Sequence, residues 1–148
     1  MTAPGAFTSG YVLTAADMND LPAGVVEFSQ RNTSKALSTT SATIISDVVS
    51  LVAGRKYLIM AFGNTFATST TMVVKAQITV NATAIQTVDI AVSATLDESN
   101  ISTFTVYTAA SSGSFTIAYI AETSTGTTFV RGYTTLGGAA LAIIDIGD

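Results

Sequence analysis

The sequence predicts an all-β protein, an antiparallel two-sheet sandwich of jelly-roll-like type with a short N-terminal arm that contains one small helix. Three observations lead to this prediction. Threonine and serine supply 25 and 15 of the 148 residues, and threonine, like valine, is branched at Cβ and favours extended backbone. Apolar residues recur in short segments bounded by turn residues, and no helical period is sustained for three turns. The length suits one domain with a single core, because domains usually contain about 100 to 200 residues.

The organisation of the chain changes near Leu21-Pro22, which separates an arm, residues 1–23, from a sandwich domain, residues 24–148. In the arm, Thr14 is suited to cap a helix that ends before Pro22. Such a helix has about two turns, and a helix this short is marginal in isolation. We therefore expect the arm to be ordered only by packing on its own domain or on a partner.

The rest of the chain is predicted to form short strands separated by turns. They are expected at residues 25–30, 35–37, 42–52, 56–65, 72–80, 84–92, 102–108, 114–122, 127–133 and 139–146. Asp47 is expected to split the third strand in two, and residues 96–100 to form an exposed loop.

Two pairs of neighbouring strands are predicted to form hairpins. Residues 72–80 alternate between apolar and polar side chains, and Asn81-Ala82-Thr83 is suited to the tip of a hairpin that leads into 84–92. Residues 102–108 and 114–122 are predicted to pair across a serine- and glycine-containing turn. The alternation fits a jelly roll or an immunoglobulin-like sandwich, and the pattern alone leaves both open.

Two strands are apolar on both faces, at residues 57–62 and 139–146. Both are predicted to lie in the interior of the fold. Because only 11% of the residues are charged, we infer that part of an outer sheet is covered by another subunit, which makes a homo-oligomer. The alternative is a monomer whose surface is covered by threonine and in which these strands are merely central.

Composition excludes several classes of function. The chain has no cysteine and no histidine, which removes disulfides, thiolate and imidazole catalysis and most zinc, copper or haem sites. The net charge is −4 and the basic residues are scattered, so binding to nucleic acid is disfavoured. No apolar run is long enough to span a membrane and no secretory signal is recognisable, so we expect a protein that is made in the cytosol.

The remaining candidates for catalysis or metal binding are weak. Ser34 and Lys35 are adjacent, and neighbours on a strand point to opposite faces, so they do not form a catalytic pair. Acidic residues occur in three pairs that are better explained as a helix cap, a loop and a terminus: Asp17 with Asp20, Asp97 with Glu98, and Asp145 with Asp148. A calcium site in the Asp97-Glu98 loop is the strongest of these alternatives. We predict no catalytic residue, no cofactor and no metal.

Three stretches of the chain resemble small structural proteins of tailed bacteriophages, mostly minor tail or head-decoration proteins. The most specific is FTSGYVLTAADMNDLPAGVV at residues 7–26, and the others are LVAGRKY at 51–57 and LAIIDIG at 141–147. Together they cover about a quarter of the chain. The last stretch departs from the usual form, because Ile144 stands where an acidic residue often precedes Asp-Ile-Gly.

The resemblance implies a non-enzymatic virion protein that is made in the host cytoplasm and has a β-sandwich body, commonly trimeric. Its partners would be copies of itself and the major capsid or tail proteins, to which the arm would attach it. The apolar residues of the arm are the candidates for this docking: Phe7, Tyr11, Val12, Leu13, Met18 and Leu21.

Two other functions remain as alternatives. The first is a module that binds a host surface glycan or receptor through exposed loops at residues 69–71 and 94–100. The second is a hydrolase of cell-wall polymer, which the missing histidine and the scattered acidic residues disfavour.

Overall fold

The structure is a computed structural model that describes residues 24–67, 72–92, 98–125, 128–132 and 138–147. These residues form ten strands and no helix, so none of them belongs to a helix that crosses a membrane. The strands are β1 (Gly24–Arg31), β2 (Lys35–Leu37), β3 (Ala42–Leu51), β4 (Lys56–Ala67), β5 (Met72–Val80), β6 (Thr83–Val92), β7 (Glu98–Thr108), β8 (Gly113–Thr123), β9 (Thr128–Val130) and β10 (Ala139–Gly147). The helix predicted in the arm lies outside the described residues.

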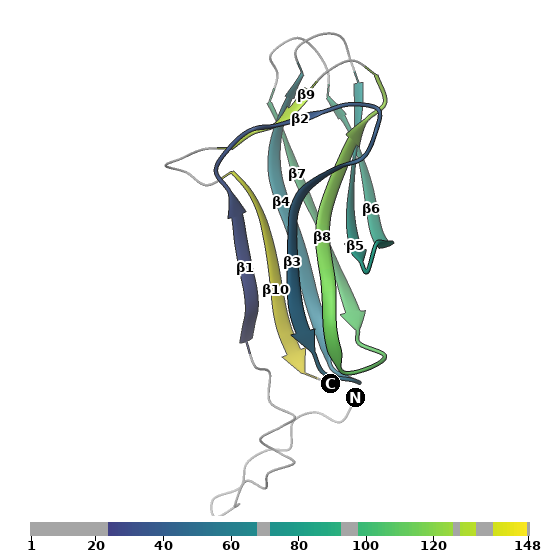
Figure 1. Ribbon diagram of the computed structural model, residues 1–148. Helices are drawn as coiled ribbons and strands as arrows, with labels where there is room; N and C mark the ends of the chain where they lie inside the picture. The colour runs from purple at the N-terminus through teal and green to yellow at the C-terminus, as the bar shows by residue number, and fades with distance from the viewer. Residues whose placement is uncertain (1–23, 68–71, 93–97, 126–127, 133–137, 148) are drawn as a thin grey trace, which may run out of the picture.

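The strands form two antiparallel sheets packed face to face (Figure 1). One sheet has four strands in the order β3-β8-β5-β6. The other has six: β1, β10 and β4 follow one another, β7 pairs with the far edge of β4, and the short β9 and β2 extend the sheet at one end. Strand β4 lies in the middle of its sheet, as its two apolar faces predicted. The structure thus confirms the two-sheet sandwich.

The pairing of the strands is nested, and this selects the jelly roll over the immunoglobulin-like alternative. The first long strand pairs with the last, β1 with β10, and inside this pair lie β3 with β8, β4 with β7, and β5 with β6. Successive pairs alternate between the two sheets. One long hairpin rolled up on itself gives this arrangement, which is the jelly roll.

The predicted split of the third strand at Asp47 is wrong, because β3 is continuous from Ala42 to Leu51. Asp47 points inward at the edge of the sandwich, where its Oδ1 accepts a hydrogen bond of 2.9 Å from the hydroxyl of Ser29 on β1. The irregularity in β3 lies between Thr43 and Ile45, where a bulge turns both Ile44 and Ile45 to the interior.

The predicted hairpin of residues 102–108 and 114–122 is also wrong, because β7 and β8 belong to different sheets. The short connection between them crosses from one sheet to the other at the end of the sandwich. It is bound there to the β3–β4 turn, since the Gly54 N–H donates to the Ala109 carbonyl and the Ala53 N–H to the Ser112 hydroxyl. The sequence pattern of a short turn does not distinguish a hairpin from such an arch. By contrast, the hairpin tip at Asn81-Ala82 is confirmed, with φ of 49° and 65° at these two residues.

The largest differences between the predicted and observed strand bounds are in β7 and β9, and the other strands differ by at most two residues at either end. Strand β7 begins at Glu98, so the end of the predicted 96–100 loop is strand, and residues 93–97 lie outside the described part. Strand β9 covers only Thr128–Val130 of the predicted 127–133.

The core contains two fully buried tyrosines in different polar surroundings. The Tyr57 hydroxyl accepts a hydrogen bond of 2.9 Å from the Val52 N–H, whereas the Tyr119 hydroxyl has no hydrogen-bond partner among the described residues. Burial also raises the pKa of Tyr119 above its ordinary range.

We expect the two tyrosines to respond oppositely to loss of the hydroxyl. Tyr57→Phe removes the acceptor of the partly buried bond from the Val52 N–H and should lower the free energy of unfolding by about 1 kcal/mol. Tyr119→Phe removes an unpaired polar group and should leave stability unchanged or raise it by about 1 kcal/mol. Urea denaturation of both variants measures the difference, and an equal loss in both would contradict this assignment.

Candidate functional site

The outer side of the six-stranded sheet carries a continuous apolar surface. In β4 and β10, Ile59, Ala61, Leu141 and Ile143 point into the core, so the residues that alternate with them point outward. The outward-facing apolar residues, which we call the apolar face, are Val25, Phe28, Leu58, Met60, Phe62, Phe104, Val106, Ala140, Ala142, Ile144 and Ile146.

The register of the strands aligns these residues in rows across the sheet. One row runs Val25–Ile144–Leu58–Val106, and the next runs Phe28–Ala142–Met60–Phe104. A third row, Gln30–Ala140–Phe62–Ser102, begins and ends with polar residues. No charged side chain occurs in these three rows. The apolar face is therefore uncharged in its interior. It becomes polar at the end toward β2 and β9, and Lys56 follows it at the opposite end of β4.

Much of the apolar face is accessible in the described structure. Phe28, Phe62 and Phe104 are 53%, 38% and 65% exposed. A phenylalanine has roughly 200 Å² of surface, so these three alone expose on the order of 300 Å². Val25, Val106 and Ile146 add to this area. The largest apolar patch on a typical monomer is about 300 to 600 Å², and patches of this size usually mark interaction sites.

The outer side of the four-stranded sheet has the opposite character. Its outward residues are mostly hydroxyl-bearing or charged: Thr43, Ser46, Ser50, Lys75, Thr87, Asp89, Ser114, Thr116 and Glu122. The apolar exceptions on this side are Val48 on β3, Val73 and Ala91 on the neighbouring β5 and β6, and the half-buried Ile120 on β8. Exposed threonine and serine side chains are thus concentrated on the outer side of the four-stranded sheet. Exposed apolar side chains predominate on the outer side of the six-stranded sheet.

A polar cluster with a hollow of about 300 Å³ lies on this hydroxyl-rich side. Lys75 Nζ forms an ion pair of 2.8 Å with Glu122 Oε1, and the Ser41 hydroxyl donates to the other carboxylate oxygen. The hydrogen bond to Glu122 raises the pKa of Lys75, and hydrogen bonds from Lys75 and Ser41 lower the pKa of Glu122. Each ion stabilises the other, so neither is poised to transfer a proton near neutral pH. The pair links β5 to β8.

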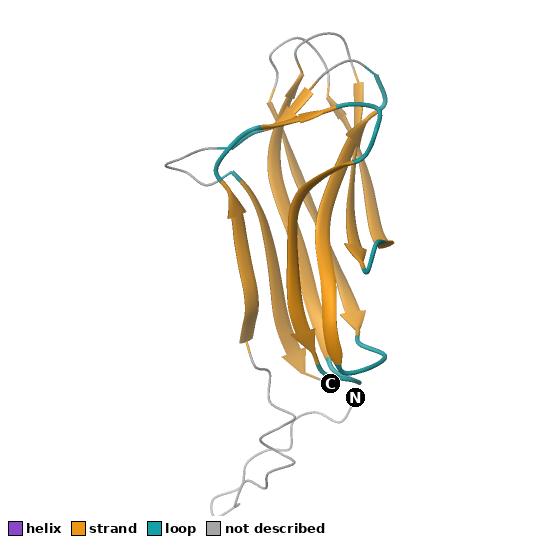
Figure 2. Ribbon diagram, viewed as in Figure 1, coloured by secondary structure: helices purple, strands orange, loops and turns teal. Residues whose placement is uncertain are grey.

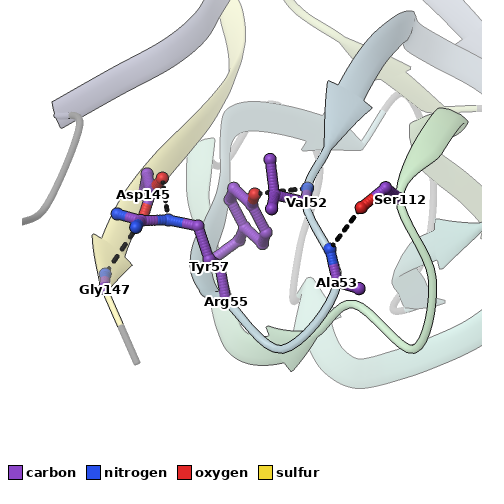
Figure 3. A network of polar contacts seen from close by, with 7 residues as sticks. All are labelled: Val52, Ala53, Arg55, Tyr57, Ser112, Asp145 and Gly147. Carbon is purple, nitrogen blue, oxygen red and sulfur yellow. Dashed lines mark hydrogen bonds and ion pairs between the residues drawn. The ribbon is translucent and has the colours of Figure 1, made fainter. Parts of the chain in front are cut away.

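A second polar network closes one end of the sandwich (Figure 3). Arg55, in the turn before β4, makes two hydrogen bonds with the carboxylate of Asp145 on β10, of 2.7 and 3.0 Å. Their side chains are only 11% and 6% exposed. The Gly147 N–H donates to the same carboxylate, and the Tyr57 hydroxyl holds the start of the turn at Val52.

The pKa of Asp145 reflects this network. Burial alone would raise it, but the hydrogen bonds from Arg55 and Gly147 and the charge of Arg55 outweigh burial, so the pKa is lowered. The network joins two of the stretches on which the phage resemblance rests, residues 51–57 and 141–147. Its role in the fold is to fasten the last strand to the β3–β4 turn.

The structure places only some of the candidate residues predicted from the sequence. All six docking residues of the arm lie outside the described residues, as do Asp17, Asp20, Asp97 and Asp148. The described chain begins at Gly24, which pairs with Asp145, and the next residue, Val25, belongs to the apolar face. The arm therefore joins the body at a corner of that face.

The described residues offer no constellation for catalysis or metal binding. The Ser34 hydroxyl accepts a hydrogen bond from the Gly132 N–H, and Lys35 is the first residue of β2. Both residues therefore have a structural role. No group of three or more acidic side chains that could hold a metal ion occurs within the described residues.

The expectation that another subunit covers part of an outer sheet stays a prediction, and sequence reasoning did not identify the aromatic residues at the two edges of the apolar face. Phe28 and Phe104 alternate with inward residues on β1 and β7, and that alternation was the available signal. It became interpretable only once the register placed both residues in one row with Ala142 and Met60.

Comparison with known proteins gives a limited result. No family model matches the chain, and no curated protein matches it. Among solved structures, a chain in the structure of infectious bursal disease virus, Gx strain, is similar with a TM-score of 0.47 and 12% sequence identity. The similarity covers 88% of this chain and 37% of that chain. The present chain thus spans well under half the length of that solved neighbour.

Proposed function

We propose that this chain is a non-enzymatic structural protein of a tailed-bacteriophage virion, either a capsid decoration protein or a minor tail protein. The observation that carries the proposal is the division of the surface into an uncharged apolar face and a hydroxyl-rich face on opposite sheets. Such a surface suits a subunit of a larger assembly, because one side can pack against neighbouring proteins while the other side remains in contact with solvent. The resemblance of residues 7–26, 51–57 and 141–147 to phage structural proteins supplies the kind of assembly.

In this proposal residues 1–23 attach the protein to the particle and the sandwich projects outward. Both ends of the described chain, Gly24 and Gly147, lie at the same end of the sandwich, and β2 and β9 lie at the other (Figures 1 and 2). An arm that leaves from one end lets the body stand away from its point of attachment. Each apolar side chain of the arm that becomes fully buried contributes about 1.5 to 3 kcal/mol before the cost of ordering the arm is subtracted.

Deletion of residues 1–23 tests this attachment. We expect the shortened chain to keep its β-sheet circular dichroism and cooperative unfolding, because the described core lies entirely in residues 24–147. It should be absent from particles purified after infection, as measured by immunoblotting of sedimented virions. Normal incorporation of the shortened chain would refute the role of the arm.

Two matched full-length variants sharpen the experiment. Replacing Phe7, Tyr11 and Leu13 by alanine should abolish incorporation, whereas replacing Thr2, Thr8 and Ser9 by alanine should leave it unchanged. The alternative function predicts a different result, since a glycan-binding module gives signals on a glycan array. We expect the intact protein to give none.

A further inference from the structure

We propose that the apolar face is the surface through which copies of this chain bind one another. This inference goes beyond the attachment proposed above, because it concerns the association of the sandwich domains in solution and does not depend on the arm. Its occupant is a second copy of the same face or of an adjoining part of the same sheet.

The area of the apolar face fits such an interface. A stable protein interface buries about 800 Å² on each partner, and homodimer interfaces are about 65% apolar. Each partner must then supply roughly 500 Å² of apolar surface. The three phenylalanines provide on the order of 300 Å², and Val25, Val106, Ile146 and the half-buried Leu58, Met60 and Ile144 extend it. The apolar face is therefore of the size that one partner of such an interface must supply.

The distribution of charge favours an identical partner. The chain carries a net charge of −4, so two copies repel each other unless they meet where no acidic side chains face one another. The three rows of the apolar face satisfy this condition. Asp89 and Glu122 project from the opposite sheet, and Asp47 and Asp145 point toward the interior. The half-buried Glu27 on the edge strand β1 is in register with the inward-facing Ile143, so it lies outside the three rows.

Availability of the partner also favours self-association. A folded chain that exposes this face is prone to non-specific aggregation until the face is covered. Copies of the same chain are present wherever it is synthesised, whereas a different virion protein must first be encountered. The sheet itself is suited to the contact, because two sheets pack face to face about 10 Å apart when their side chains are apolar.

The test compares exposed valines on the two outer faces in the full-length protein. Val106 lies on the apolar face and is 54% exposed, and Val48 lies on the hydroxyl-rich face and is 70% exposed. Both project outward from the interior of a strand, so lysine at either site should leave the fold intact. We expect Val106→Lys to weaken self-association by at least about 100-fold, Phe104→Lys to do the same, and Val48→Lys to have no effect.

Light scattering during size exclusion gives the mass, and thermal unfolding monitored by circular dichroism verifies the fold of each variant. Wild type and Val48→Lys should have a mass of at least two 15.2 kDa chains, and Val106→Lys the mass of one. A mass of three chains would also meet the expectation of a trimer. A monomeric wild type, or a Val106→Lys variant that folds and keeps the wild-type mass, would overturn the inference.

Other occupants give distinguishable results, each of which refutes self-association through this face. If residues 1–23 cover the face within one chain, wild type is monomeric and deletion of the arm makes it associate. If another virion protein covers it, wild type is monomeric and Val106→Lys is lost from particles. The proposed function is tested by a different result. It is refuted if the chain that lacks residues 1–23 is incorporated into particles normally, whatever the mass of the protein in solution.

Discussion

Asp145→Asn is expected to lower the free energy of unfolding by about 3 kcal/mol, because it removes the negative charge from the largely buried ion pair with the Arg55 guanidinium. Breaking a buried ion pair by removing one partner usually costs about 3 to 5 kcal/mol, and the isosteric amide places this variant at the lower end. The bond from the Gly147 N–H can persist to the amide oxygen, so the loss reports mainly on Arg55. Urea or guanidinium denaturation of the full-length chain measures it.

The exposed ion pair provides the control. Glu122→Gln breaks the Lys75–Glu122 pair, whose side chains are much more accessible, and should cost less than about 1 kcal/mol. Equal losses in the two variants would show that burial of the Arg55–Asp145 pair has no energetic consequence.

The pH dependence of stability should differ between wild type and Asp145→Asn. Because the pKa of Asp145 is lower in the folded protein than its ordinary value of 3.8, the folded state favours the ionised carboxylate. The resulting stability is complete well above pH 3.8 and is lost as the pH falls through the unfolded and then the folded pKa. Wild type should therefore lose more free energy of unfolding than Asp145→Asn between about pH 5 and pH 2.

Gly138→Ala should have the second largest effect on stability. A Cβ at Gly138 would collide with the carbonyl oxygen of Arg31 and lie 2.7 Å from the Cα of Gly132. Both are backbone atoms, so two segments of main chain must separate to admit the methyl group. We expect a loss at the upper end of the roughly 1 to 3 kcal/mol that overpacking costs, measured as a shift in the urea midpoint.

Gly63→Ala is the matched control for this substitution. Here the added Cβ would meet the Tyr119 hydroxyl at 3.1 Å and a Val130 methyl at 3.4 Å, and both are side-chain atoms. The loss should be smaller than in Gly138→Ala, and combining it with Tyr119→Phe should recover part of it. If Gly63→Ala proved the more destabilising of the two, close backbone approach would not be the reason for glycine at position 138.

The fold could be predicted in large part because local patterns determine strands. The bounds of β2 and β5 follow from the sequence without change, and β4 was placed in the middle of a sheet because both of its faces are apolar. What failed were features that depend on distant residues. Asp47 stays within a continuous strand because Ser29 provides it with a hydrogen bond, and no local signal indicates that partner.

The candidate surface was predictable only in outline. Low charge and doubly apolar strands predicted that an outer sheet is covered, but the rows of the apolar face depend on the register of β1, β10, β4 and β7, which come from opposite ends of the domain. The same is true of Arg55 and Asp145, which the roll of the chain brings together. The arm residues remain a prediction, since none of them lies in the described part.

The nested pairing of the strands has a consequence for the timing of synthesis. Of the ten described strands β10 is synthesised after the others, yet it lies between β1 and β4 in the sheet that carries the apolar face. Contacts between such distant parts of a chain form late and slowly. A nascent chain therefore cannot complete the sheet that carries the apolar face until β10 has been synthesised, so the rows of that face form after the other strands are already available.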